Sequence, residues 1–283
     1  MKGKSETGPA FLDTLAASLV TSRRGSGDVN ALGTTFLVFL FVAAGAIIGL
    51  ALRRNLPGHH IDDNAKGIVN MVMGLVATMS ALVLGLLIVS AKSNFDTQSG
   101  YVAQLAAQAI EIDRILAHYG PETAETRDLF RETVVLGVQR IWPNDRMMPG
   151  NLEPPQQRGQ LEAFYEHLER LDPKTSGQRI GQSNAMQLST DLLRIRTLMY
   201  EKLRNSLAFP FLVVLVFWLI LLFAGFGLQT QANPTVLTAL LLGALSTAGA
   251  VFLILELDQP YDGLIRVSSE PLQRAIAALD QPL

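Results

Sequence analysis

The sequence IVNMVMGLVATMSALVLGLLIVSA occupies residues 68–91 and contains no charged residue. A helix of about 20 apolar residues crosses the roughly 30 Å hydrocarbon core of a bilayer, so this stretch predicts a transmembrane helix. Lys92 follows without a Pro or a turn cluster, and apolar residues then recur every three or four positions as far as Tyr119. This spacing is typical of an amphipathic helix in a bundle. One helix is therefore expected to leave the membrane and continue into a soluble domain.

Three further windows have the same length and apolar character, at residues 32–52, 207–228 and 235–257. They account for the high hydrophobic content of the chain, 49%, and for its charged content of only 17%. A soluble protein has about 25% charged residues. We predict an all-α, polytopic membrane protein with four transmembrane helices.

The rest of the chain is expected to form polar segments around these spans. Gly120 with Pro121, the Pro-rich segment 143–155, and Asp172 with Pro173 divide residues 92–206 into four amphipathic helices. A four-helix cytoplasmic domain is thus predicted between the second and third spans. The predicted domain boundaries are a polar N-terminal segment at 1–31, transmembrane hairpins at 32–91 and 207–257, the helical domain at 92–206 and a cytoplasmic tail at 258–283.

Composition and motifs argue against most chemical functions. The net charge of −2 does not suggest a nucleic-acid surface, and the chain has no Cys for thiolate chemistry. Phosphate-binding loops, GxSxG and HExxH are absent from the sequence, so we expect no enzyme activity and no cofactor. His118 and His167 are interpreted as surface residues.

One loop raises the question of a metal site. His59 and His60 precede Asp62 and Asp63 in the connection between the first two spans. Adjacent histidines on an extended loop point apart, and their spacing does not place them on one helical face. We favour a solvated loop over a metal site there.

Small residues line one side of the second span. Ala77, Ala81 and Gly85 recur every four residues, as do Gly74 and Thr78. Such a face allows close helix packing, and it would also suit the lining of a pore. Packing is the favoured interpretation, and the pore remains the alternative.

A GxxxG pair in the first span, Gly45 and Gly49, indicates a second close helix contact. Packing inside the protein's own bundle is favoured over a dedicated contact between subunits.

Charged residues gather where the fourth span ends. A functional network at the membrane boundary could include Glu256, Asp258, Tyr261, Asp262 and Arg266. Carboxylates deep in a bilayer are energetically costly and are therefore candidates for a functional role. In the alternative interpretation, this segment only shapes the turn by which the chain leaves the membrane.

The distribution of basic residues predicts the orientation. An even number of spans places the N-terminus, the helical domain and the C-terminus on one side, and the positive-inside rule makes that side cytoplasmic. Near the spans, that side carries Arg23, Arg24, Lys92, Arg194, Arg196, Lys202, Arg204 and Arg266, against Arg53, Arg54 and Lys66 on the other.

Three stretches resemble the uncharacterised bestrophin-like family of bacterial membrane proteins. They are GLVATMSALVLGLLIVSAKSNFD at 74–96, IDRILAHYGPE at 112–122 and ILELDQPYDGLIRVSSEPL at 254–272. The more distant true bestrophins are pentameric anion channels with four spans and cytoplasmic helices, so the resemblance implies a candidate activity in which the second span lines the pore. The chain has no acidic run resembling their calcium clasp, and its second span lacks the aromatic residues of their hydrophobic neck. Calcium gating is therefore not implied.

Two functions follow as hypotheses. The first is a membrane-anchored helical protein with an interaction or structural role, and the alternative is an oligomeric, bestrophin-like anion channel. Either would be a multi-pass protein of the bacterial inner membrane, with both termini cytoplasmic. We expect the lipid bilayer, further copies of the chain and a cytoplasmic protein as partners, and no nucleic acid.

Overall fold

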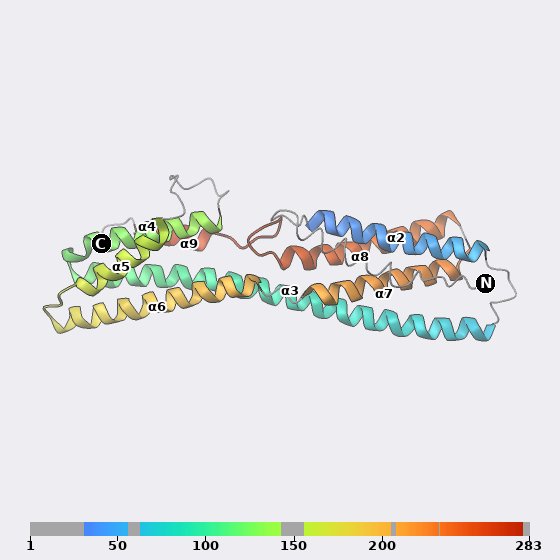
Figure 1. Ribbon diagram of the computed structural model, residues 1–283, viewed down its shortest axis with the longest axis horizontal. Helices are drawn as coiled ribbons and strands as arrows, with labels where there is room; N and C mark the ends of the chain where they lie inside the picture. Colours follow the sequence, from blue (N-terminus) through green and yellow to red (C-terminus); the bar gives the residue numbers. More distant parts are fainter. Residues whose placement is uncertain (1–30, 56–62, 143–155, 205–207, 232, 280–283) are drawn as a thin grey trace, which may run out of the picture. The chain divides into compact units, whose positions relative to one another are not determined.

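The computed structural model describes residues 31–55, 63–142, 156–204, 208–231 and 233–279 (Figure 1). Helices make up all the regular secondary structure of these residues. The elements are α2 (Ala31–Asn55), α3 (Asp63–Tyr119), the 3-10 helix η2 (Pro121–Thr123), α4 (Ala124–Ile141), α5 (Gln156–Arg170), α6 (Ser176–Arg204), α7 (Ala208–Gln229), α8 (Pro234–Leu257) and α9 (Glu270–Leu279).

The chain divides into two compact units, which we call the apolar unit (Met1–Asn94 and Ser206–Ile265) and the polar unit (Phe95–Asn205 and Arg266–Leu283). Helix α3 contributes residues to both, because it runs without interruption for 57 residues. The continuous helix predicted from the sequence is thereby confirmed.

Four helices of the described chain are long and apolar enough to cross a membrane, as the sequence predicted. They are α2, the first part of α3, α7 and α8, and α7 is the most apolar of them. Asn233 caps the start of α8, since its side-chain oxygen accepts a hydrogen bond from the backbone N–H of Thr235.

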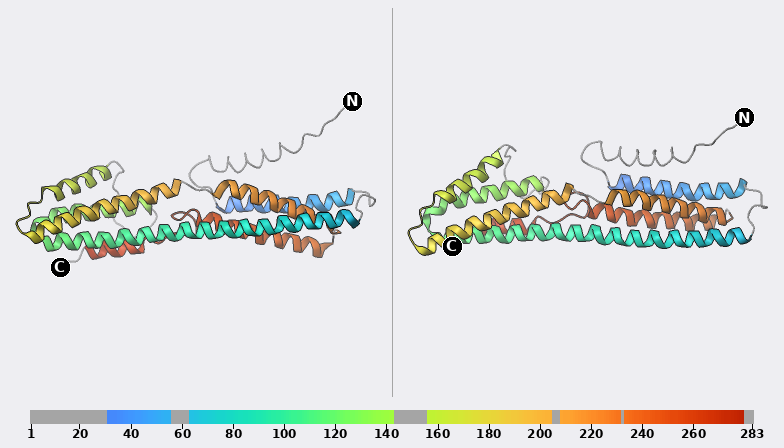
Figure 2. Two further views of the ribbon diagram at one scale, coloured as in Figure 1. Left: turned by 90° about the horizontal axis from the view of Figure 1, so that it is seen from below. Right: turned by 60° about the horizontal axis from the view of Figure 1, so that its bottom comes forward.

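Within the apolar unit, α2 packs along α7 and α8 (Figures 1 and 2). Gly45 and Gly49 allow this close approach, because a Cβ at Gly45 would lie 2.9 Å from the carbonyl oxygen of Ile220, and one at Gly49 would overlap the backbone of Ala224. From the other side, Gly227 of α7 meets the backbone of α2 at Ala46. The GxxxG pair thus packs inside the protein's own bundle, as the favoured interpretation predicted.

The polar unit contains the second part of α3 with η2, α4, α5, α6 and α9. Its core includes the full stripe predicted for α3, with Val102, Leu105, Ala109, Ile112, Leu116 and Tyr119 all buried. Phe130 of α4 and Phe164 of α5 join it, with ring centroids 5.0 Å apart. Helix α9 belongs to this unit, although the sequence predicted a separate tail at 258–283.

Two polar groups tie the polar unit together. Gln98 is fully buried, and its Nε2 donates to the carbonyl of Met199 at 3.2 Å. Trp142 is buried where α4 ends, and its Nε1 donates to the carbonyl of Val267 at 3.0 Å. The second bond explains why the segment leading into α9 docks here, because a buried indole N–H needs an acceptor.

Candidate functional site: the exposed faces of the second span

The span part of α3 packs against the rest of the apolar unit along a single face. Ser80, Leu87 and Ala91 are buried on this face. Met73 reaches α7, where its sulfur accepts a hydrogen bond from Gln229 Nε2 at 2.9 Å and lies over Gly225. These residues fix α3 beside α7 and leave its remaining faces uncovered.

The small-residue face predicted from the sequence lies on an uncovered side of α3. Gly74, Thr78, Ala81 and Gly85 are exposed, and Ala77 is half-buried at the edge of the packed face. A Cβ added at Gly74 or Gly85 would meet no atom within 4 Å. In the described part of the chain this face therefore packs against no other helix, and helix packing inside one bundle does not explain it.

A third face of α3 carries large apolar side chains. Leu75, Leu82 and Leu86 are 62%, 73% and 66% exposed. At 100° per residue, the small-residue face lies about 125° around the helix from the packed face, and the leucine face lies about 90° further on. Only 11% of the most apolar window of α3 is buried, against 44% for α7. Helix α3 thus has two uncovered faces of different character.

Among the charged residues predicted at the end of the fourth span, Glu256 makes hydrogen bonds to backbone N–H groups. Glu256 is buried, and its Oε2 accepts hydrogen bonds from the backbone N–H groups of Leu264 at 2.7 Å and Ile265 at 3.1 Å. Gly263 has a φ of +87°, and a Cβ there would lie 2.6 Å from Glu256 Oε2. The carboxylate therefore anchors the turn that follows α8.

The other members of that predicted set lie around this turn. Asp258 is the C-cap of α8 and is half-buried, and its backbone N–H donates to the carbonyl of Ile254 at 3.0 Å. Tyr261 is half-buried and Asp262 is exposed. Arg266 is exposed and belongs to the polar unit. A functional network of all five side chains stays a prediction.

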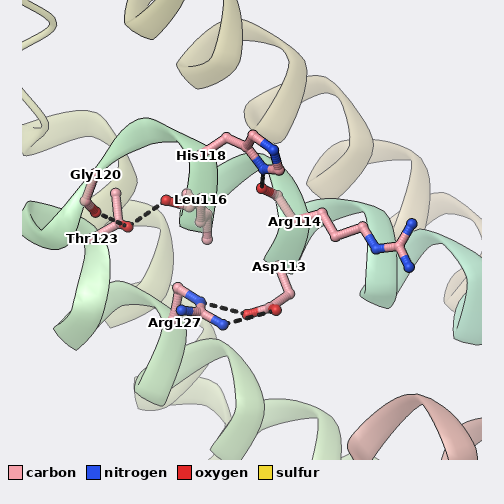
Figure 3. A network of polar contacts seen from close by, with 7 residues as sticks. All are labelled: Asp113, Arg114, Leu116, His118, Gly120, Thr123 and Arg127. Atoms are coloured by element: carbon pink, nitrogen blue, oxygen red, sulfur yellow. Dashed lines mark hydrogen bonds and ion pairs between the residues drawn. The ribbon is translucent and has the colours of Figure 1, made fainter. Parts of the chain in front are cut away.

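In the polar unit, an ion pair braces the turn between α3 and α4 (Figure 3). Arg127 donates from Nε and Nη2 to the two carboxylate oxygens of Asp113, at 2.7 and 3.0 Å. This hydrogen-bonded carboxylate raises the pKa of Arg127 above its ordinary value. Thr123 adds a second brace, because its hydroxyl lies within hydrogen-bond distance of the carbonyls of Leu116 and Gly120. Neither brace was predicted from the sequence.

The turn between α3 and α4 begins at Gly120, where the sequence predicted the end of a helix. Gly120 has φ 137° and ψ 177°, which is the mirror image of an extended conformation, and Pro121 then opens η2 before α4 begins. An L side chain is strained there, so the glycine is still required.

The sequence predicted His118 to be a surface residue, and it predicted the loop with His59 and His60 to be solvated. His118 is exposed, and its Nδ1 lies 2.8 Å from the carbonyl of Arg114. His59, His60 and Asp62 lie outside the described residues. Among the described residues, no group of three His, Cys, Asp or Glu side chains could hold a metal ion.

A sequence model of the Bestrophin-like domain matches residues 39–272. The chain belongs to the bestrophin-like family. A crystal structure of a bacterial bestrophin homologue from Klebsiella pneumoniae, determined with a point mutation, has the same fold. The two chains are 13% identical and superpose with a TM-score of 0.63, over 87% of this chain and 97% of that one. A search of curated proteins finds no match.

The bestrophin-like domain begins within α2 and ends within α9, so it takes in all four spans and residues of both units. Both features described above, the uncovered faces of α3 and the Glu256 turn, lie inside it. The family resemblance seen in the sequence at residues 74–96 and 254–272 is confirmed, and these stretches contain those two features.

Proposed function

We propose that this protein is one subunit of a homo-oligomeric ion channel that conducts anions. True bestrophins are oligomeric anion channels, and the relationship of the bestrophin-like family to them supports the channel over the interaction or structural role favoured by sequence composition. The observation that carries the proposal is the exposure of α3, a membrane-length helix with only 11% of its most apolar window buried.

The two uncovered faces of α3 suit different surroundings. Leucine side chains gain free energy when they leave water for lipid or for a neighbouring subunit, so the face with Leu75, Leu82 and Leu86 is suited to an apolar environment. The face with Gly74, Thr78, Ala81 and Gly85 would gain little from such burial, and its small side chains leave room for a column of water and ions. We assign this small-residue face to the pore.

The chemistry of this face is compatible with a neutral pore. No charged residue occurs in residues 68–91, so an ion would meet only weak dipoles there. The hydroxyl of Thr78 donates to the carbonyl of Gly74 at 2.9 Å. To serve a passing anion, the proton would have to rotate away from that carbonyl toward the pore, which is a small rearrangement for a threonine side chain.

The proposed arrangement in the cell follows from the charge distribution. The polar unit and both chain termini face the cytoplasm, and the spans cross the inner membrane of a bacterium. A ring of subunits would bring together several copies of the small-residue face around one axis, because closed rotational symmetry repeats the same surface in every subunit.

An ion-flux measurement tests the proposal. Purified protein in liposomes under a potassium chloride gradient should give a current whose reversal potential lies near the chloride equilibrium potential. A reversal near the potassium potential would keep the channel but contradict the anion preference. Absence of current from correctly assembled protein would contradict the channel and favour the interaction or structural role.

Variants of α3 make the test specific. Ala81→Phe places a large ring on the small-residue face, so we expect at least a tenfold loss of current. The matched control Leu75→Phe adds a ring to the leucine face and should keep most of the current. Native mass spectrometry of each variant checks that the oligomer still forms.

A further inference from the structure

One side of α8 is uncovered along much of the helix. The side chains of Leu242, Leu245 and Leu253 are exposed, and a Cβ added at Gly249 would meet no atom within 4 Å. These four residues follow one another at intervals of three, four and four, which places them on one helix face. We call this surface the uncovered face of α8. Because α8 is long and apolar enough to span a membrane, the face is suited to contact hydrocarbon.

Glu256 extends the uncovered face at the end of α8. At 100° per residue, it lies about 60° around the helix from Leu253 and about 20° from Leu245. The helix therefore directs this residue to the same side as the exposed leucines. Its side chain is nevertheless only 3% exposed. Another part of the chain must cover the carboxylate, which would be costly in contact with hydrocarbon.

The turn after α8 provides this cover. The backbone N–H groups of Leu264 and Ile265 donate to Glu256 Oε2, and a Cβ at Gly263 would lie 2.6 Å from the same atom. Leu264 comes seven residues after Leu257, the last residue of α8, yet its backbone nitrogen is only 2.7 Å from that oxygen. The chain thus folds back and holds Leu264 at the level of the last helical turn. The side chain of Leu264 is 73% exposed there.

We propose that the turn at residues 262–265 is a membrane anchor, in which the side chain of Leu264 inserts between the lipid headgroups and the acyl chains. Without the turn, the uncovered face of α8 would end in a carboxylate, and the turn puts a leucine in its place. Burial of this leucine in lipid is favourable, whereas its exposure to water is not. Asp262 is exposed on the same turn, and such a mixture of apolar and charged side chains is typical of segments at the headgroup level.

Lipid is the partner because the exposed Leu264 is continuous with the exposed leucines of a membrane-spanning helix. The bilayer that covers the uncovered face of α8 therefore reaches the turn as well. The proposal is independent of the channel function, since it requires only that α8 crosses a bilayer. All the residues involved belong to the apolar unit.

Spin labels can measure the position of Leu264 relative to the bilayer. The chain has no Cys, so Leu264→Cys gives the full-length protein a single nitroxide attachment site. Electron paramagnetic resonance in nanodiscs compares collisions of the label with oxygen, which concentrates in hydrocarbon, and with a nickel chelate, which stays in water. Asp262→Cys is the matched control on the same turn. We expect the oxygen-to-nickel collision ratio to be about threefold higher at Leu264→Cys than at Asp262→Cys, and higher still at Leu253→Cys.

A second set of variants tests whether the carboxylate holds Leu264 in place. Glu256→Ala removes the acceptor of the two backbone N–H groups, so in this background the label at Leu264→Cys should become more mobile and its collision ratio should fall towards that of Asp262→Cys. Glu256→Gln keeps one acceptor oxygen and should lower the ratio less. The ratio at Leu253→Cys should stay high in both backgrounds, which verifies that α8 still crosses the bilayer.

Three results would overturn the proposal. The first is a collision ratio at Leu264→Cys as low as that at Asp262→Cys, because the turn would then lie in water. The second is an immobile label at Leu264→Cys that neither reagent reaches, which would make the turn a contact between protein surfaces. The third is an unchanged ratio after Glu256→Ala with α8 still in the bilayer, since the carboxylate would then have no part in positioning Leu264.

Discussion

The α2–α7 contact and the span part of α3 use the same residue type in opposite ways. At the α2–α7 contact, Gly45 and Gly49 lie against the backbone of α7, and no side chain would fit. On α3, Gly74 and Gly85 have no neighbour within 4 Å. Both pairs are spaced to share one helix face. A small-residue face in a membrane helix can therefore either pack against another helix or stay uncovered. Only the position of the neighbouring backbone distinguishes the two cases.

The largest loss of stability is expected when a side chain is added at one of the packed glycines of α2. Gly49→Leu would force the Leu side chain into the backbone of Ala224, and such overpacking costs roughly 3 kcal/mol or more because the backbone must move. We expect loss of monodisperse protein on size-exclusion chromatography in detergent. Gly85→Leu is the matched control and should give a normally folded subunit. Equal loss of both variants would mean that the α3 face is packed after all.

The second largest loss of stability is expected at Glu256, which is buried and accepts hydrogen bonds from the turn after α8. Glu256→Ala leaves the backbone N–H groups of Leu264 and Ile265 without this acceptor, and we expect a loss of about 2–3 kcal/mol in stability, measured as the shift of the thermal unfolding midpoint. Glu256→Gln keeps one acceptor oxygen and should lose clearly less. If the two variants were equally stable but only one lost current, the carboxylate would have a functional role instead.

Gly263 is a third case, because its backbone conformation and the nearby carboxylate of Glu256 both disfavour a side chain at this position. Gly263→Ala must adopt a φ near +87° and places its Cβ against the Glu256 carboxylate. We expect a destabilisation of about 1–3 kcal/mol. Combining it with Glu256→Ala should give less than the sum of the two effects, since both act on the same turn. Strict additivity would show that the two residues are independent.

The smallest change in stability is expected at Tyr119, a buried residue whose hydroxyl has no hydrogen-bond partner among the described residues. Removing an unsatisfied buried hydroxyl relieves a desolvation cost, so Tyr119→Phe should stabilise the protein by about 1 kcal/mol at pH 7. The measurement is again the thermal midpoint. Destabilisation would reveal a partner for the hydroxyl in the assembled protein.

The same residue gives a prediction for alkaline pH. Burial, and then the charges of Glu122 and Asp172, raise the pKa of Tyr119 above its ordinary value of 10.0. The folded state therefore keeps the proton that the unfolded state loses, so this contribution to stability is present below pH 10 and falls as the pH rises above 10. Tyr119→Phe should flatten the decline of the thermal midpoint between pH 9 and pH 11.

Much of the fold followed from the sequence because its signals are local. The uncharged run at 68–91 continues into a periodic stripe with no Pro between them, so a single helix was the expected result. The stripe ending at Leu116 and Tyr119 was predicted as core and is buried. Length and composition alone were enough for the four spans.

Other features depend on contacts between distant residues, which periodicity does not encode. Asp113 and Arg127 are separated by a turn, and only the conformation at Gly120 brings them together. The docking of α9 depends on the bond from Trp142 to Val267. Glu256 was identified as a candidate by its position at a span boundary, but its backbone partners could not be deduced, because they require the positive φ of Gly263.

The most direct test of the account is the accessibility of α3 to water in the working protein. The chain contains no Cys, so single cysteines can be introduced without first replacing native ones. Ala81→Cys and Leu82→Cys place thiols on the small-residue face and the leucine face of the same helical turn. We predict that a charged, water-soluble thiol reagent will change the current through Ala81→Cys and leave that through Leu82→Cys unaltered. The reverse pattern, or no effect at Ala81→Cys despite a measurable current, would contradict a pore lined by the small-residue face of α3.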